Sequence, residues 1–304
     1  MKRLILQILS AIIIVLISIF LPSTEIKNEF LDKYATTLGI IQGATEFLPI
    51  SSTAHMVIFE QFIAAKHSGQ KQDVIHQENP VHEFGTIIQL GSVLAMIFLY
   101  FSRIKLILSG IFLFNKEGLQ LLLKLILGLM PCAVIGLMIN DFLKKFCKPQ
   151  CLAIALATGA FVMLFGEKFY KKSKKIDNFD AISYKTAFSI GLCQCFAFIP
   201  GVSRSMTTIV GGYLSNLSRS VSIEFSFLLG TATMGLAALY KLVFSQINAI
   251  IAPFYSIKGT LVAFLTSLLM MKLSIYILKK YGLYLFAIYR ILLAMAIIFL
   301  VNFY

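Results

Sequence analysis

Long apolar runs separated by short polar segments recur from one end of the chain to the other. Six of these runs are long enough to cross, or nearly cross, a hydrocarbon core of about 30 Å as helices. The predicted spans are residues 84–101, 119–139, 152–166, 221–243, 257–278 and 283–303. Because nothing in the pattern separates off a soluble module, we predict one all-α polytopic membrane domain.

Two further apolar stretches are interrupted near their middle by proline and hydroxyl residues. Residues 35–65 are broken at 49–53, and residues 184–213 are broken at 200–205. Non-helical backbone at membrane depth persists only where protein or a water-filled cavity satisfies its polar groups. We therefore predict two re-entrant helix hairpins.

Residues 4–21 form another apolar run, about 18 residues long, behind two basic residues. The run lacks a small-residue cleavage site, so we expect an uncleaved anchor helix with its N-terminus in the cytoplasm. Residues 1–34 are then an anchor and linker, and residues 35–304 are the membrane domain.

The surroundings of the two hairpins are alike. Gly39-x-x-Gln42 precedes the first break and Gly191-x-x-Gln194 precedes the second, and three predicted spans follow each hairpin. These features predict an inverted repeat with halves at about 35–166 and 184–304, whose two breaks meet near the midplane.

Composition and charge agree with a membrane protein. Hydrophobic residues make up 58% of the chain and charged residues 13%, and the mean hydropathy is +0.85. Soluble domains carry roughly 25% charge, so most ordinary cytosolic enzymes are excluded. The net charge of +13 comes from basic clusters between apolar runs, as in loops that face anionic cytoplasmic lipid, so we expect no nucleic-acid partner.

The positive-inside rule orients the predicted spans. With the N-terminus inside, Arg103, Lys105, the lysines of 168–175 and those of 279–280 all fall on the cytoplasmic side. The lysines of 144–148 fall outside, against the rule. In this orientation the first hairpin enters from outside and the second from inside.

Residues that carry chemistry gather at the first break. Gln42 and Glu46 are four residues apart and share a helix face, while Ser51 and Ser52 lie four and three residues before His55. A helix beyond the break therefore brings a carboxamide, a carboxylate, a hydroxyl and an imidazole around one space.

The second break carries an arginine among hydroxyl residues. Arg204 lies just after Pro200 and Gly201 and four residues before Thr208, and Ser203 and Ser205 flank it. A helix that begins here directs free N–H groups and a guanidinium into the same space, which suits a phosphate or diphosphate.

Each of these polar residues, taken alone, also fits a structural role such as an N-cap or a turn. Taken together they do not, because a carboxylate, a histidine and an arginine each cost several kcal/mol at bilayer depth and usually mark substrate or ion pathways. Glu83 and Glu224 precede spans, and either ion ligation or helix capping fits them. The five cysteines show no metal-ligand spacing, and we predict no disulfide.

Two segments closely resemble the signatures of the bacterial undecaprenyl-diphosphate phosphatase family, the BacA type associated with bacitracin resistance. They are residues 42–56, QGATEFLPISSTAHM, and residues 200–208, PGVSRSMTT. The resemblance extends to residues 88–92, 224–229 and 286–290, and so covers about residues 35–304. Gln42 stands where some members of the family have a glutamate.

The resemblance implies hydrolysis of the terminal phosphate of a C55 polyprenyl diphosphate at the outer side of the bacterial cytoplasmic membrane. It also implies a divalent cation, Mg²⁺ or Ca²⁺, and the expected partners are the lipid substrate, membrane lipids and a second copy in a homodimer. The site residues divide by role. The catalytic set is Ser52, His55, Glu46 and Arg204; the diphosphate is bound by Arg204, Ser203, Ser205, Thr208, Ser51 and Thr53; the cation is held by Glu46 and Gln42.

Two alternatives remain open. Ser52 is expected to be the nucleophile, or to position it, with His55 as its proton acceptor, and the alternative makes His55 the attacking group. The rival function is an ion-coupled secondary transporter or a polyprenyl-phosphate translocase with the same fold, in which Glu46, His55 and Arg204 form a proton relay.

Overall fold

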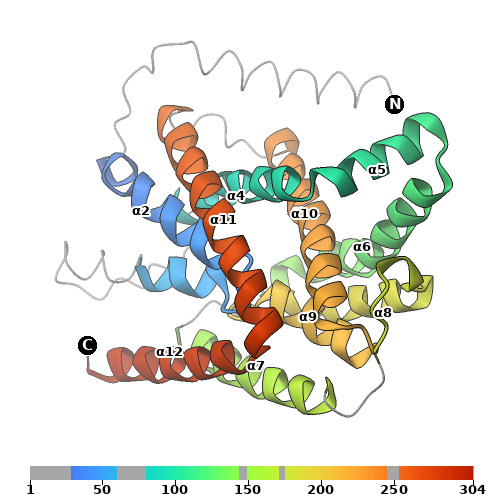
Figure 1. Ribbon diagram of the computed structural model, residues 1–304. Helices are drawn as coiled ribbons and strands as arrows, with labels where there is room; N and C mark the ends of the chain where they lie inside the picture. The colour runs from blue at the N-terminus through green and yellow to red at the C-terminus, as the bar shows by residue number, and fades with distance from the viewer. Residues whose placement is uncertain (1–28, 60–79, 144–148, 171–174, 245–252, 304) are drawn as a thin grey trace.

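The computed structural model describes residues 29–59, 80–143, 149–170, 175–244 and 253–303, which are largely helical (Figure 1). The elements are α2 (Glu29–Thr45), α4 (Pro80–Leu99), α5 (Phe101–Leu113), α6 (Lys116–Leu143), α7 (Pro149–Tyr170), η2 (Phe179–Ala181), α8 (Tyr184–Gln194), η3 (Cys195–Phe198), α9 (Arg204–Leu214), α10 (Arg219–Phe244), α11 (Pro253–Tyr281) and α12 (Tyr284–Phe303). Residues 52–59 form a further helix. Over these ranges the β-structure is a single bridge between Ile176 and Leu217, so the all-α prediction is confirmed.

Four helices in the described ranges are long and apolar enough to cross a membrane, namely Lys116–Gly136, Pro149–Tyr170, Arg219–Tyr240 and Ser256–Tyr281. They confirm the second to fifth of the six predicted spans. The sixth lies in α12, whose apolar part, Tyr284–Phe299, is shorter. The chain is a multi-pass membrane protein, and its predicted anchor at 4–21 lies outside the described residues.

The first predicted span differs from the observed helices. α4 ends at Leu99, and α5 then continues in a direction bent by 84°. We expected Arg103 in a loop, but it lies in α5, where its Nε is 2.7 Å from Glu224 Oε1 of α10 and its guanidinium lies over the Phe179 ring. The ion pair holds α5 against α10. The sequence did not predict the bend, because hydropathy gives the length of an apolar run and not the direction of its helix. Glu224 is thus paired with Arg103.

Glycines let several helices pack with their backbones close together. A Cβ added at Gly39 would lie 2.6 Å from the Gly259 oxygen, so α2 lies directly on α11. A Cβ added at Gly191 would lie 2.2 Å from the Gly128 oxygen, so α8 lies directly on α6. Small residues at helix contacts are typical of membrane proteins, where association depends on packing and not on the hydrophobic effect.

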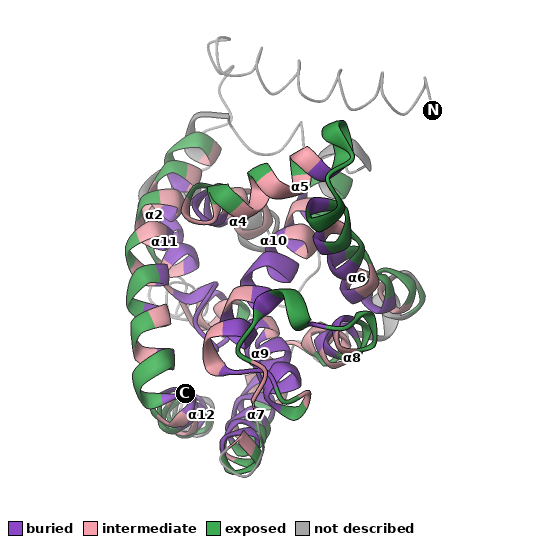
Figure 2. Ribbon diagram, turned by 45° about the vertical axis from the view of Figure 1, so that its right-hand side comes forward, coloured by how far each residue is buried: buried purple, intermediate pink, exposed green. Residues whose placement is uncertain are grey.

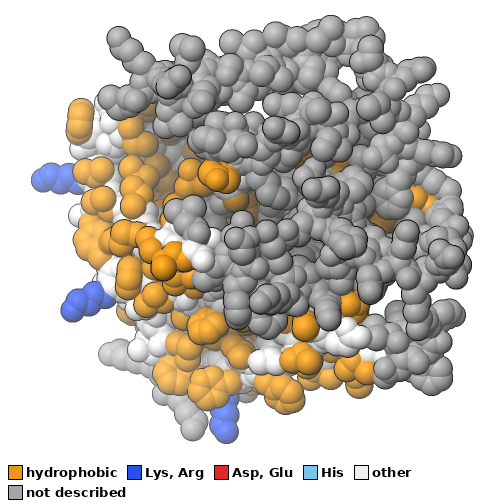
Figure 3. All heavy atoms as spheres, turned by 180° about the vertical axis from the view of Figure 1, so that it is seen from behind, with side chains coloured by type: hydrophobic (Ala, Val, Ile, Leu, Met, Phe, Trp, Pro, Cys, Tyr) orange, Lys and Arg blue, Asp and Glu red, His pale blue; other side chains and the backbone are white. Residues whose placement is uncertain are grey.

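The buried helix faces turn toward the centre of the molecule and the exposed faces turn outward (Figure 2). Exposed side chains include large apolar ones, among them Leu261, Leu265 and Leu269 on α11 and Phe112 on α5. Hydrophobic side chains also dominate the described part of the face in Figure 3, with Lys and Arg projecting at its edge. Apolar surface of this extent fits a protein surrounded by lipid.

Arg290 of α12 joins the two helix breaks. Its guanidinium is fully buried, and in the described part of the chain no carboxylate pairs with it. It donates instead to four backbone carbonyls, those of Pro49 (3.3 Å), Ala155 (3.1 Å), Leu156 (3.1 Å) and Gly201 (3.1 Å). Because Pro49 and Gly201 belong to different breaks, this one side chain ties both breaks to α7.

We expect Gly159→Ala to destabilise the protein far more than Gly166→Ala. Both glycines are buried on α7, but a Cβ at position 159 would overlap the Arg290 guanidinium, whereas one at 166 would meet the Val210 side chain at 3.1 Å. Moving the guanidinium breaks hydrogen bonds to buried carbonyls, which costs about 1–3 kcal/mol for each group left unpaired. Thermal unfolding in detergent measures the difference, and equal melting temperatures for the two variants would contradict the role of Arg290.

Candidate active site

The first break begins where α2 ends at Thr45. Residues 46–50 form turns, and Ser51 adopts a left-handed φ of 71° before the helix at 52–59 begins. A positive φ is uncommon for a residue with a side chain and is found where the surrounding structure enforces it. The Ser51 hydroxyl accepts a hydrogen bond from the Ala54 N–H (3.4 Å) and so caps the new helix.

The second break lies between η3 and α9. Gly201 has a φ of 93°, a conformation that suits a glycine, and Ser203 then caps α9 by accepting a hydrogen bond from the Met206 N–H (3.4 Å). Arg204 is therefore the first residue of α9. Its side chain starts at the positive end of a helix dipole.

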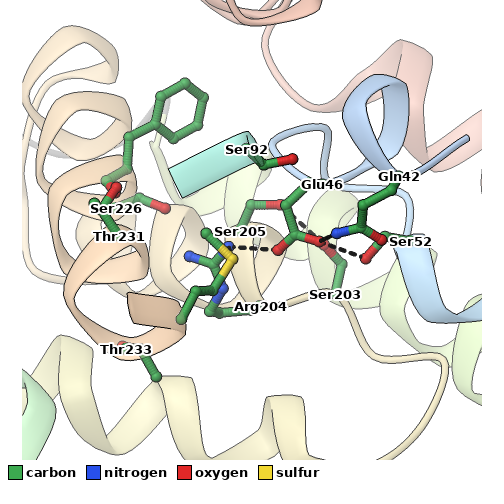
Figure 4. Close-up of polar contacts among 12 residues, drawn as sticks. Gln42, Glu46, Ser52, Ser92, Ser203, Arg204, Ser205, Ser226, Thr231 and Thr233 are labelled. Atoms are coloured by element: carbon green, nitrogen blue, oxygen red, sulfur yellow. Dashed lines mark hydrogen bonds and ion pairs between the residues drawn. The ribbon is translucent and has the colours of Figure 1, made fainter. Parts of the chain in front are cut away.

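A buried ion pair joins the two breaks. Arg204 Nη2 lies 2.8 Å from Glu46 Oε1, and the other carboxylate oxygen, Oε2, accepts hydrogen bonds from Gln42 Nε2 (2.7 Å) and Ser52 Oγ (2.8 Å) (Figure 4). The Glu46 side chain is 5% exposed and that of Arg204 is 13% exposed. A carboxylate this buried is stable only with such partners, so the four residues form one unit.

This unit borders a cavity of about 230 Å³. Six residues from the predicted site line it: Glu46, Ser51, Ser52, Thr53, Ser203 and Arg204. The structure thus brings a carboxylate, a guanidinium and several hydroxyls from two distant parts of the sequence to one space.

Three other predicted residues support the cavity and do not line it. Gln42 reaches Glu46 from α2, one turn before it. Ser205 donates to the Leu48 carbonyl (2.9 Å) and so links the second break to the first. Thr208 donates to the Arg204 carbonyl (2.9 Å) and contacts the Ser226 hydroxyl of α10.

His55 lies away from the cavity lining, against α12. Its Nδ1 is 2.7 Å from the Ser51 carbonyl oxygen and its Nε2 is 2.6 Å from the Tyr289 hydroxyl, and the two rings stack with centroids 5.7 Å apart. A carbonyl only accepts, so Nδ1 carries the proton and Nε2 accepts from Tyr289 when the ring is neutral. We predicted His55 as the proton acceptor of Ser52. In the structure the Ser52 hydroxyl donates to Glu46 and not to His55.

The cavity lining also contains residues that the sequence analysis did not assign to the site. They are Gln89, Cys132, Gln194, Ala197, Phe198, Val202, Thr233, Met234 and Ala237. Gln89 and Gln194 lie in segments that stood out, 88–92 and the repeated Gly-x-x-Gln. The apolar residues carry no comparable signal, because they look like every other residue of an apolar helix.

The oxygen donors around Glu46 are of the kind that binds a hard cation, but they are too few to fill its coordination shell. In the described part of the chain no three His, Cys, Asp or Glu residues come together. Among the described lining residues Glu46 is the one carboxylate, with the Gln42 amide oxygen and the Ser52 hydroxyl close to it. Oxygen donors of this kind suit a cation that takes its remaining ligands from phosphate and water.

Comparison with known proteins gives one consistent match. Residues 35–296 match the family model described as "Bacitracin resistance protein BacA". The undecaprenyl-diphosphatase of Campylobacter fetus subsp. fetus (strain 82-40) is 38% identical over 268 residues, which cover 85% of this chain and 95% of that protein. The undecaprenyl-diphosphatase of Bacillus velezensis is 34% identical over 275 residues, which cover 88% of this chain and 97% of that protein.

We expect Arg204→Met to destabilise the protein strongly, and Glu46→Gln in the same background to restore much of the loss. Removing one partner of a buried pair leaves an uncompensated charge and costs about 3–5 kcal/mol, whereas removing both charges does not. Melting temperatures of the two single variants and the double variant give the coupling. A double variant no more stable than Arg204→Met would show that the two groups do not compensate each other.

Proposed function

The chain belongs to the bacitracin-resistance BacA family, and we propose that it hydrolyses undecaprenyl diphosphate to undecaprenyl phosphate and inorganic phosphate. As an undecaprenyl-diphosphatase it recycles the lipid carrier of peptidoglycan and other cell-wall polymers. One observation supports this function most directly: the buried ion pair of Glu46 and Arg204 brings Ser52 and Ser203 to the same cavity.

Arg204 and the start of α9 would bind the diphosphate. The guanidinium is a planar fork that matches phosphate oxygens, and the N-terminus of α9 favours an anion. An arriving phosphate competes with Glu46 for Arg204, and so frees one carboxylate oxygen. Phosphoryl transfer requires mainly positioning and neutralisation of charge, which these groups supply.

Ser52 would attack the terminal phosphorus, with Glu46 as its proton acceptor. The Ser52 hydroxyl already donates to Glu46 Oε2 at 2.8 Å, within the reach of a general base. As the new O–P bond forms and the bond to the bridging oxygen breaks, the Ser52 proton passes to Glu46 and undecaprenyl phosphate leaves. Water then hydrolyses the phosphoserine. Both ring nitrogens of His55 already have partners, which favours a positioning role for His55 through the Ser51 carbonyl.

We also propose that the enzyme uses a divalent cation, Mg²⁺ or Ca²⁺. When bound, the cation would neutralise charge on the phosphate oxygens. Glu46 and the amide oxygen of Gln42 would hold it, and the hard oxygen donors around them support this assignment.

The helix packing supports an inverted repeat. Exchanging the two halves pairs α2 with α8, α4 with α10, α6 with α11 and α7 with α12. Under this exchange the contact of α2 with α11 becomes that of α8 with α6, and the contacts of α4 with α10 and of α7 with α12 map onto themselves. We infer that the breaks are the related sites of two re-entrant hairpins.

We further propose that the protein lies in the cytoplasmic membrane with the cavity toward the periplasmic side. Basic residues from three elements meet at one end of the molecule: Arg219 pairs with Glu167 at 2.7 Å, Lys175 lies over the Tyr170 ring, and Lys279 and Lys280 end α11. A basic end of this kind is expected in the cytoplasm. Thr233, Met234 and Ala237, which line the cavity, lie toward the opposite end of α10.

Phosphate release by the purified protein from undecaprenyl diphosphate tests the function, and a transporter would release none. We expect Ser52→Ala and Glu46→Gln each to lower kcat by about 100-fold or more, since each removes a transition-state contact. Ser274→Ala is the matched control, because that buried hydroxyl has no hydrogen-bond partner in the described chain. Activity should also fall on chelation, and chelator-resistant turnover would exclude the cation.

Rapid quench of the reaction should trap an acid-stable phosphoserine at Ser52. The proton acceptor is already in place there, whereas His55 would first have to release Tyr289. Mass mapping of the labelled peptide identifies the residue. A phosphohistidine at His55 would overturn the serine mechanism and support the alternative in which the imidazole attacks.

A further inference from the structure

The cavity consists of two differently built halves. The two breaks supply the polar half, with Glu46, Ser52, Ser203 and Arg204. The other half comes from η3, α6 and α10 and is lined mainly by Ala197, Phe198, Met234 and Ala237.

The polar groups in the second half are engaged with one another. Gln194 Nε2 lies 3.1 Å from the Thr233 hydroxyl and 3.2 Å from Cys132 Sγ, and that hydroxyl also donates to the Leu229 carbonyl. These contacts leave the apolar side chains as the surface that a ligand would meet. The second half is therefore suited to hydrocarbon and not to phosphate.

One face of α10 connects the guanidinium with the outside of the protein. Gly230 lies directly against Arg204, where a Cβ would overlap the guanidinium, and Met234 Sδ lies 3.1 Å from Arg204 Nη2. Ala237 follows on the same face and is exposed. The separation of seven positions between Gly230 and Ala237 corresponds to about 10 Å along the helix axis.

The opening at Ala237 lies among residues that face lipid. Leu236 and Tyr240 beside it are 53% and 59% exposed, and all three belong to the apolar span Arg219–Tyr240. Among the described lining residues the other exposed one is Thr53, which belongs to the polar half. The cavity thus has one apolar opening toward lipid and one polar edge.

We propose that Ala197, Phe198, Met234 and Ala237 form an apolar portal that binds the first isoprene units of the polyprenyl chain and passes the rest of the chain into the bilayer. The assignment rests on the proposed function, because that function places the diphosphate at Arg204. The chain attached to a diphosphate at Arg204 must leave the cavity, and the portal is the apolar route that continues from that residue.

The size of the cavity determines what the portal can recognise. A volume of about 230 Å³ is below the roughly 300–1,000 Å³ of pockets that enclose drug-sized ligands, so it accommodates a diphosphate and the start of a chain. The remaining isoprene units lie in lipid. We therefore expect the portal to favour substrates that carry a prenyl chain, and to bind C15 and C55 diphosphates with similar affinity.

Ala237→Phe tests the portal, with Leu236→Phe as the matched control on the neighbouring position outside the lining. We expect Ala237→Phe to raise KM at least tenfold for both C15 and C55 diphosphates. The effect on a C5 diphosphate, whose single unit is too short to pass the portal, should be less than threefold. Leu236→Phe should leave all three KM values within twofold of the unmodified protein.

Two outcomes would overturn the portal. If KM for the C15 substrate stays within twofold in Ala237→Phe, the chain does not pass this residue. If turnover of the C5 substrate falls as much as that of C15, position 237 controls access of the diphosphate itself, and the chain leaves elsewhere.

A photoreactive C15 diphosphate, with a diazirine on its first isoprene unit, tests the portal in the unmodified protein. Cross-links should map to peptides that contain Phe198 or Met234, and undecaprenyl diphosphate, but not phospholipid, should compete with them. Cross-links at Thr53 or Gln89, or competition by phospholipid alone, would refute the assignment. If the protein releases no phosphate yet cross-links at Met234, the proposed function fails and the portal stands.

Discussion

A helix that breaks inside an apolar protein leaves backbone carbonyls without partners, and Arg290 supplies donors to both breaks at once. Its guanidinium reaches Pro49, Gly201 and two carbonyls of α7 from a position that is fully buried. Unpaired polar backbone in such surroundings costs several kcal/mol per group, so neither break is stable alone. Together with the Glu46–Arg204 pair and the hydrogen bond from Ser205 to the Leu48 carbonyl, Arg290 keeps the two breaks side by side around the cavity.

The charges around the cavity favour an anion before any ligand arrives. Arg204 belongs to the second break, and Arg290 contacts carbonyls of both breaks. Of the lining residues that the structure describes, Glu46 is the one carboxylate. A net positive site with low-dielectric walls attracts a diphosphate and strengthens each contact that it makes. The Glu46–Arg204 pair keeps the guanidinium compensated until phosphate oxygens replace the carboxylate.

The two breaks also share a construction that their sequences reveal only in part. In each, a proline follows the end of the incoming helix, a residue with positive φ turns the chain, and a serine caps the outgoing helix. Pro49, Pro200 and the serines were visible as a pattern, so the breaks and most of the polar cavity lining could be predicted. The positive φ of Ser51 could not, because it depends on the packing that holds it.

The sequence by itself determined the helical membrane architecture and four of its spans, because apolar run length is a local property. It also predicted that Glu46, Ser52, Ser203 and Arg204 lie around one space, because charged and hydroxyl residues at the breaks of apolar segments stand out in the sequence. Tertiary structure decided what those residues touch. It directed Ser52 to Glu46 and His55 to Tyr289, bent α4 into α5, and used Arg290 to hold the breaks together. The contacts of His55 with Tyr289 and of Arg290 with Pro49 join residues more than two hundred positions apart, and the bend depends on helix direction. The Ser52–Glu46 contact is local in the chain, but it depends on the turns at 46–51. Regular helical spacing encodes none of these.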